Sequence, residues 1–346
     1  MPKKKIWALL FALISWLVFD HLELAPPEAH SPAPVLYGEH ASKEAQLYAN
    51  QNRDDLTQLY LDAIAQARRS VHLVIYALTD PRIITALRTQ SQKGISVHVV
   101  ADAKASPQLD QKLGPKATVV RRFGPGLTHQ KLLAIDGHTL LVGSANLTSE
   151  SLRMHGNLVT VVQSEEAARL AIQKAETLKI EGVCEAIPCK RFRLGSQEME
   201  CWFLPDNRHA ARRIKELLAS AKKTVQVAMF TWTHKELAQA VIQAAERGVK
   251  VDLVIDGHSG KGASDKIVKL LKQKGMNIAL SQGGPLLHHK FLLIDGEILV
   301  NGSTNWTRAA FNQNDDCFIV LDPLTDLQKK QMQRLWTTIK KESEPQ

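Results

Sequence analysis

Two stretches of the sequence carry the same polar residues at the same spacing. They are THQKLLAIDGHTLLVGSANLT (residues 128–148) and HHKFLLIDGEILVNGSTNW (residues 288–306). Every matching pair is separated by 159 positions. The pairs are His129 and His288, Lys131 and Lys290, Asp136 and Asp295, Gly143 and Gly302, Ser144 and Ser303, and Asn146 and Asn305. A polar constellation that is repeated at fixed spacing indicates a reaction centre rather than a packing feature.

The residue types fit a displacement reaction at a tetrahedral anion. Alternate residues of a strand share one face, so each histidine points the same way as the lysine two positions later. The Gly-Ser turn adds backbone N–H groups and a hydroxyl, and the asparagine adds an amide donor. Two such sets can surround one phosphate, with one imidazole attacking phosphorus and the other protonating the leaving oxygen.

The elements that position these residues are also duplicated. Residues 68–106 match residues 222–260 at an offset of 154. Each copy has a short apolar run, a helix-period segment that stops at Gly94 or Gly248, and a second apolar run that ends in aspartate. This order predicts two β–α–β units with largely parallel strands. We expect further helices near residues 55–69, 165–180, 208–222 and 324–341.

The fold class predicted from this pattern is α/β. We expect two α/β/α domains that arose by internal duplication and that pack as a pseudo-dimer within one chain, with one shared active site. The expected divisions are an N-terminal signal or anchor and Pro-rich spacer (1–39), a first domain (40–180), a Cys-containing linker (181–205) and a second domain (206–346).

The repeated pattern His-x-Lys-x4-Asp-x6-Gly-Ser-x-Asn resembles the signature of the phospholipase D superfamily, and both copies match it in full. The resemblance covers nearly all of residues 40–342. It implies a phosphodiesterase that needs no metal or other cofactor and that works through a phosphohistidine intermediate at one site between the domains. It also implies that His129 and His288 are nucleophile and acid, and that Lys131, Lys290, Asn146 and Asn305 bind the phosphate. Ser144 and Ser303 would support them, whereas Asp136 and Asp295, with Gly143 and Gly302, would be structural.

The two copies differ at one position that members of this family usually keep acidic, 11 residues after the motif asparagine. The second copy has Asp316 there, and the first has Asn157. A carboxylate raises the pKa of an imidazole that it holds, and an amide does not. If each partner serves the histidine of its own half, His288 is the general acid and His129 the nucleophile.

The reaction centre does not identify the substrate, because lipids and nucleic acids present the same phosphodiester. The chain has 346 residues and a net charge of +9, which suits a polyanion or an anionic membrane surface. We expect a monomeric phospholipid hydrolase of the phospholipase D type. The alternative is an exported endonuclease, and a cardiolipin-synthase-like phosphatidyl-transferase or an inactive binding protein is less favoured.

The N-terminus predicts export or anchoring to a membrane. Three lysines precede the uncharged residues 6–19, which as a helix would span about 21 Å, nearer to a signal-peptide core than to a membrane span. Cleavage and retention as an anchor both stay open. In an exported chain the cysteines, Cys184, Cys189, Cys201 and Cys317, permit two disulfides in three possible pairings, and in the cytosol they would be free thiols. The cysteine spacing does not favour zinc.

Overall fold

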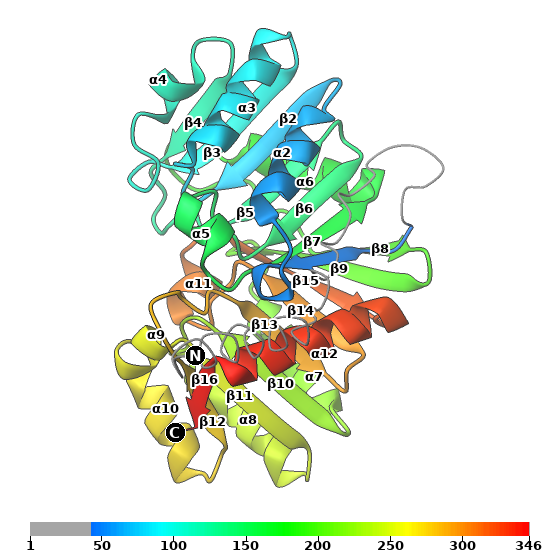
Figure 1. Cartoon of the computed structure of the whole chain (residues 1–346), viewed down its shortest axis with the longest axis vertical. Helices are drawn as coiled ribbons and strands as arrows, with labels where there is room; N and C mark the ends of the chain where they lie inside the picture. Colours follow the sequence, from blue (N-terminus) through cyan, green and yellow to red (C-terminus); the bar gives the residue numbers. More distant parts are fainter. Residues whose placement is uncertain (1–42, 346) are drawn as a thin grey trace, which may run out of the picture. The chain divides into compact units, whose positions relative to one another are not determined.

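The computed structural model describes residues 43–345, and the predicted signal or anchor lies outside these residues. The first half of the chain builds a seven-stranded sheet in the order β1-β7-β6-β5-β2-β3-β4 (Figure 1). Its strands are β1 (Gln46–Ala49), β2 (Ser70–Ile75), β3 (Ser96–Asp102), β4 (Thr118–Arg122), β5 (Lys131–Ile135), β6 (Thr139–Gly143) and β7 (Leu158–Gln163). Strands β2, β3 and β4 are parallel, as the β–α–β pattern predicts, and β5 joins β2 in the antiparallel sense.

The second half builds a nine-stranded sheet in the order β16-β12-β11-β10-β13-β14-β15-β9-β8. Its strands are β8 (Lys190–Leu194), β9 (Gln197–Leu204), β10 (Thr224–Met229), β11 (Lys250–Ile255), β12 (Ile278–Ser281), β13 (Lys290–Ile294), β14 (Ile298–Gly302), β15 (Asp316–Asp322) and β16 (Ser343–Pro345). The six strands from β15 to β12 repeat the order and directions of β7 to β4 in the first sheet. The duplication seen in the sequence is therefore a duplication of topology.

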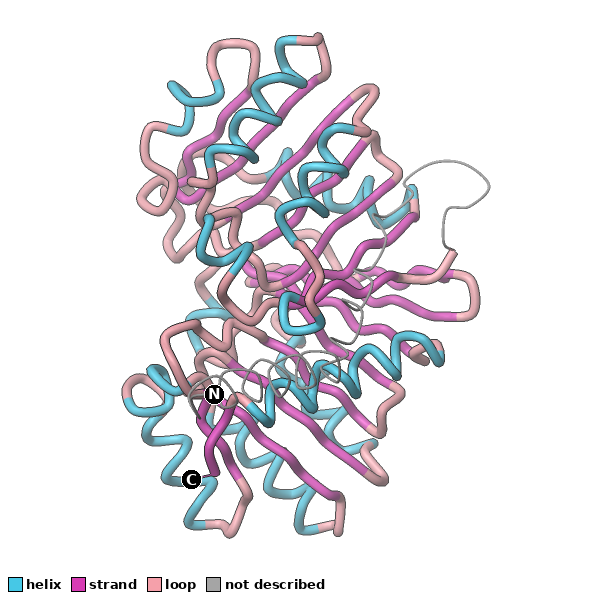
Figure 2. Tube along the Cα trace, viewed as in Figure 1, coloured by secondary structure: helices cyan, strands magenta, loops and turns pink. Residues whose placement is uncertain are grey.

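Helices cover both faces of the sheets (Figure 2). They are α2 (Leu56–Ala65), α3 (Pro81–Gln92), α4 (Leu109–Leu113), α5 (Ser149–Arg153), α6 (Glu165–Thr177), α7 (Ala210–Ser220), α8 (Lys235–Glu246), α9 (Gly257–Lys261), α10 (Asp265–Gln273), α11 (Arg308–Asn312) and α12 (Asp326–Lys341). Capping residues fix several starts; for example, the carboxylate of Asp80 accepts the N–H groups of Arg82 and Ile83 at the start of α3. The four helices predicted outside the β–α–β units are present as α2, α6, α7 and α12.

One apolar core is common to both halves. It joins side chains of the first sheet, such as Leu132 and Val142, to Phe291 and Ile319 of the second sheet, and helices α6 and α12 contribute to it. Each half also has a separate core on its other face. Because apolar burial stabilises by about 25 cal/mol per Å², a continuous core between the halves fixes their relative placement and hence any site formed by both.

The predicted linker is the part of the chain that departs most from expectation. Residues 190–204 form β8 and β9, and β9 pairs with β15 over its whole length, so this segment belongs to the second sheet. Strand β8 has only two buried apolar residues, Phe192 and Leu194, alternating with exposed arginines, and so short an alternation did not identify a strand. The four cysteines are free thiols, and the structure therefore contains neither of the two disulfides that an exported chain would permit. No helix among residues 43–345 is long and apolar enough to cross a membrane.

Candidate active site

The motif histidines lie just before equivalent strands, where the two halves meet. His129 precedes β5 and His288 precedes β13, and both side chains are buried. The strand-end aspartates fix the approach to them: Asp102 accepts the N–H of Thr128, at 3.2 Å, and Asp256 accepts that of Leu287, at 3.0 Å. Backbone hydrogen bonds from the opposite half hold the same two segments. The N–H of His129 donates to the carbonyl of Asp315 at 2.7 Å, and the N–H of Gly156 donates to that of Leu286 at 2.8 Å.

Each histidine is held by a residue of the other half. Nδ1 of His129 lies 3.1 Å from Oδ1 of Asp316, and Nδ1 of His288 lies 3.0 Å from Oδ1 of Asn157. The expectation that each partner serves its own half is therefore wrong. Asn157 lies just before β7 and Asp316 at the start of β15. Each of these side chains contacts the histidine of the opposite half. The carboxylate of Asp316 is therefore hydrogen-bonded to His129 and not to His288.

The hydrogen bonds also fix which ring nitrogens are free. A carboxylate only accepts, so the proton of neutral His129 lies on Nδ1. The amide of Asn157 donates from Nδ2 to the carbonyls of Ser151 and His155, which leaves its Oδ1 to accept from Nδ1 of His288. In both rings Nε2 is thus the nitrogen available for chemistry.

The motif serines support the residues that hold the histidines. The hydroxyl of Ser144 donates to Oδ1 of Asn157 at 2.9 Å, and the hydroxyl of Ser303 donates to Oδ1 of Asp316. Both serines are fully buried. The sequence assigned them to phosphate binding, whereas their contacts place them one layer behind the histidines.

The motif glycines let the supporting strands approach closely. A Cβ atom on Gly143 would lie 2.3 Å from the carbonyl oxygen of Leu158, and one on Gly302 would lie 2.4 Å from that of Cys317. Those carbonyls belong to the residues directly after Asn157 and Asp316. The glycines are therefore required for the two histidine partners to reach their positions.

The two motif lysines are buried beside the histidines. Nζ of Lys131 donates to the carbonyl of His129, and Nζ of Lys290 to that of His288, each at 2.6 Å. Burial lowers the pKa of Lys131 to about 7. Burial and the charge of Lys131 lower the pKa of Lys290 well below its ordinary value. Two buried ammonium groups whose pKa values are lowered, although Asp316, Asp102 and Asp256 act in the opposite direction, indicate a site suited to an anion.

The histidines share this electrostatic environment. Burial and the neighbouring Lys131 lower the pKa of His129, although Asp316 acts in the opposite direction. The pKa of His288 is lowered further, by burial and then by Lys290 and Lys131, and no carboxylate is paired with its ring. For Asp316, burial would raise the pKa, but His129 and Lys131 outweigh it and the pKa is lowered. A bound phosphate anion would offset these excess positive charges.

The motif asparagines border the same site. Oδ1 of Asn305 accepts the N–H of Thr231 at 3.2 Å, so its NH₂ group is directed elsewhere. The side-chain oxygen of Asn146 is buried and has no hydrogen-bond partner among residues 43–345. Both amides are only partly buried. The NH₂ groups of the two side chains are the donors that could bind a phosphate, as the sequence predicts.

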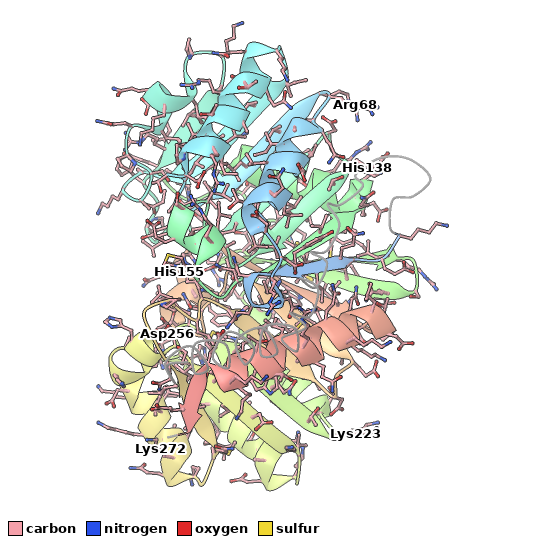
Figure 3. All side chains as sticks on the ribbon, in the orientation of Figure 1. Arg68, His138, His155, Lys223, Asp256 and Lys272 are labelled. Atoms are coloured by element: carbon pink, nitrogen blue, oxygen red, sulfur yellow. The ribbon has the colours of Figure 1, made fainter. Side chains whose placement is uncertain are left out.

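The motif aspartates are structural. The carboxylate of Asp136 accepts the backbone N–H groups of Arg68, Arg69 and Ser70, and that of Asp295 accepts those of residues 222–224. Arg68 and Lys223 mark these turns in Figure 3, and both lie away from the junction that His155 marks. Asp136 and Asp295 tie the hairpin after each motif strand to the start of β2 or β10.

Three residue pairs around the histidines were not identified from the sequence as site components. Tyr76 lies beside His129, with ring centroids 5.4 Å apart, and Phe230 lies beside His288 at 5.0 Å. The second pair is Asp102 and Asp256, whose matching positions at strand ends were the available signal. The third is His155 and its counterpart Asn314, which precede the histidine partners by two residues.

A buried ion pair joins the halves next to the site. Nε of Arg122 lies 2.6 Å from Oδ2 of Asp315, and both side chains are nearly inaccessible. The guanidinium of Arg122 is thus paired within the junction rather than exposed to solvent. His289 is also outside the reaction centre, because its Nε2 contacts Gln51 and burial lowers its pKa to about 3. His138 lies well away from the junction (Figure 3).

Comparisons with known proteins bear on the family of the chain. Residues 60–179 and 214–336 match the family model described as "Cardiolipin synthase, PLD-like domain". The mitochondrial cardiolipin hydrolase of Chlamydomonas reinhardtii is 31% identical over 160 residues, which cover 45% of this chain and 71% of that protein. The protein of the same name from Xenopus tropicalis is 30% identical over 135 residues, covering 38% of this chain and 64% of the relative.

Among solved structures, phosphatidylserine synthase of Haemophilus influenzae has the same fold. The TM-score is 0.68 at 12% identity, and the likeness covers 88% of each chain. At that identity it bears on the fold and not on the reaction. The family match covers both halves of the chain and includes both histidine motifs. The chain therefore belongs to the phospholipase D superfamily, and its reaction centre is that of a phosphodiester hydrolase.

Proposed function

We propose that this protein hydrolyses the phosphodiester bond of phospholipids through a phosphohistidine intermediate on His129, without a metal ion. The observation that carries the proposal is the crossed pairing of two histidines at one buried junction, one with a carboxylate and one with an amide. Two buried lysines beside them supply positive charge for the phosphate.

In the first step, Nε2 of His129 attacks phosphorus and the bond from phosphorus to the leaving oxygen breaks. His288, whose doubly protonated ring is favoured once the phosphate offsets the charges of Lys290 and Lys131, gives that oxygen a proton from Nε2. The ring of His129 becomes positively charged when the phosphorus–nitrogen bond forms, and Asp316 stabilises that charge through Nδ1–H. This stabilisation, rather than own-half pairing, is the reason for assigning His129 as the nucleophile.

In the second step, water attacks phosphorus and gives a proton to Nε2 of His288, while the phosphorus–nitrogen bond breaks. The products are a phosphomonoester and the released alcohol, and both histidines return to their starting states. His288 therefore acts first as an acid and then as a base. If an alcohol replaced water, the same step would be a phosphatidyl transfer.

A phospholipid substrate is supported by the family description and by the names of the relatives. Both refer to cardiolipin, a lipid with two phosphodiester groups. A nucleic-acid substrate is the second candidate, favoured by the net charge of +9. Under either proposal the protein acts as a monomer, because one chain supplies both motifs. Export or anchoring by residues 1–39 is part of the proposal and places the enzyme beside its lipid.

The test is a parallel assay of the full-length protein in mild detergent with EDTA present. Mixed micelles that contain cardiolipin or phosphatidylglycerol and single- and double-stranded DNA are the substrates, and His129→Ala is the control. We expect alcohol release from lipid that disappears in the variant. Cleavage of DNA alone would establish the nuclease, and loss of activity with EDTA would contradict the metal-free mechanism.

A further inference from the structure

The surroundings of the two motif histidines differ in one respect that the duplication does not explain. The second half is five residues longer between its strand-end aspartate and its histidine (256–288 against 102–129). Helix α9 follows Asp256, and the glycine-containing segment 282–286 leads to His288. Together they line a pocket of about 420 Å³. This volume is in the range of small-molecule sites.

The pocket shares a wall with the site of His288. Leu286 lines it, and the carbonyl of Leu286 accepts the N–H of Gly156 from the opposite half at 2.8 Å. Asp256 also lines it while holding the N–H of Leu287. His155 does not line the pocket, but it adjoins Gly156 in the chain and is near enough to Asp256 for their charges to interact, and Figure 3 shows both residues on the side of the molecule where the halves meet.

The groups that line this region favour an anion. His258 and Lys261 are exposed on α9, and Gln282 and two glycines contribute further polar groups. The carboxylate of Asp256 is the one acidic group of the lining, and both of its oxygens already accept backbone N–H groups, from Ser259 and Leu287. The His155 ring is partly exposed, 6.2 Å from the His288 ring, and has no hydrogen-bond partner among residues 43–345.

The reaction assigns a role to this side of the site. In an in-line displacement the leaving group departs opposite to the nucleophile, and His288 is the residue that protonates it. The pocket beside His288 is thus on the leaving-group side. The corresponding segment of the first half is five residues shorter, and a substrate that used this pocket would bind the pseudo-symmetric site in one direction.

We propose that this pocket binds a second phosphate, carried by the leaving group of a two-phosphate phospholipid, through Lys261, His258 and His155. The proposal rests on the proposed function and narrows its substrate class. A lipid whose leaving group is a phosphorylated glycerol would place one phosphate between the catalytic histidines and the other in the pocket. A lipid with an uncharged leaving group would leave the pocket without its anion.

The test compares two anionic lipids in the same mixed micelles. Cardiolipin has a leaving group that contains a second phosphate, whereas phosphatidylglycerol loses uncharged glycerol. We expect Lys261→Ala combined with His258→Ala to lower the ratio of kcat/KM for cardiolipin to that for phosphatidylglycerol roughly tenfold, the usual effect of losing a charge-assisted hydrogen bond. His155→Asn introduces the residue type of its counterpart in the second copy, Asn314, and should also lower this ratio. Lys261→Arg keeps the positive charge and should keep most of the wild-type ratio.

Lys272→Ala is the matched control, because it removes one exposed lysine of the same half at a position far from Asp256 (Figure 3). Its ratio should equal that of the wild type, and thermal unfolding checks that every variant is folded. An unchanged ratio in the Lys261 and His258 variant, or equal losses on both lipids, would overturn the pocket assignment while the lipase function stands. Absence of lipid cleavage by the wild type, with DNA cleavage that depends on His129, would overturn the proposed function itself.

Discussion

The carboxylate of Asp316 contacts Nδ1 of His129 at 3.1 Å, although the two residues lie 187 positions apart and belong to different halves of the duplicated chain. The reciprocal contact joins His288 to Asn157 at 3.0 Å. The duplicated site is therefore symmetric in its backbone and asymmetric in its charge. That asymmetry distinguishes the two histidines.

Asp316→Asn keeps a hydrogen-bond acceptor beside His129 and removes the negative charge. We expect kcat to fall by roughly 10²- to 10³-fold, because the charge that develops on the His129 ring is no longer stabilised. Asp326→Asn makes the same change in net charge at an exposed position on α12 and should leave kcat unchanged. Wild-type turnover by Asp316→Asn would show that the carboxylate has no part in the reaction.

The two histidines should respond differently to the leaving group. A p-nitrophenyl phosphodiester needs no proton on its leaving oxygen, whereas an alkyl ester does. In the release of alcohol during the first turnover, which precedes the step where His288 acts as a base, His288→Ala should therefore lose about 10²- to 10⁴-fold on the alkyl ester and much less on the p-nitrophenyl ester. His129→Ala should be inactive on both, since it lacks the nucleophile. Equal losses in the two variants on the p-nitrophenyl ester would contradict the assigned roles.

Lys131→Met should abolish activity and raise stability. The pKa of Lys131 is about 7 in the folded protein, whereas an unfolded lysine stays protonated to about pH 10. Protonated Lys131 therefore destabilises the folded state. The loss of unfolding free energy is greatest below pH 7, with an upper bound of about 5 kcal/mol. As the pH rises from 7 toward 10, the folded lysine is already neutral and the cost declines.

Chemical denaturation at two pH values checks this sign. The gain in unfolding free energy of Lys131→Met over the wild type should be larger at pH 6 than at pH 9. Lys272→Met, at an exposed position, is the control for a simple change of charge. A gain that increases with pH would mean that Lys131 is not destabilised by burial.

The ion pair of Arg122 and Asp315 should contribute to the joining of the halves. Arg122→Met leaves Asp315 buried without its partner, and we expect a loss of about 3–5 kcal/mol of unfolding free energy. The double variant Arg122→Met with Asp315→Leu removes both charges and should recover part of that loss. Arg169→Met breaks an exposed pair with Glu165 and should cost less than about 1 kcal/mol. Equal effects at the two pairs would indicate that burial of the first has no energetic consequence.

Much of the fold could be predicted because duplication makes local patterns visible twice. The β–α–β order, the flanking helices and the motif residues at the start of β5 and β13 all follow from repeated apolar runs and repeated spacing. The hairpin of β8 and β9 could not be predicted in the same way, because β8 has no counterpart in the first half and the counterpart of β9, strand β1, has only four residues. The apolar face of β9 indicates burial but not the sheet that buries it.

The pairing of Asp316 and Asn157 with particular histidines could not be predicted from the sequence. Their position after the motif identified them as histidine partners, and the difference in charge between them was visible. Which histidine each one serves depends on the path of the chain across the junction between the halves, and no local pattern encodes that path. The same limit applies to Asp315, whose backbone and side chain both contact the first half.

Because the hydrogen-bond partner of each motif histidine comes from the other half, neither half contains a complete site. A fragment that ends before β15 would contain His129 without its carboxylate, and a fragment that begins after β7 would contain His288 without its amide. Proteolysis between the halves followed by separation would thus leave two inert pieces, with no residual phosphodiesterase released into the surroundings. The protein can be reactive toward phosphodiesters only for as long as the whole pairing persists.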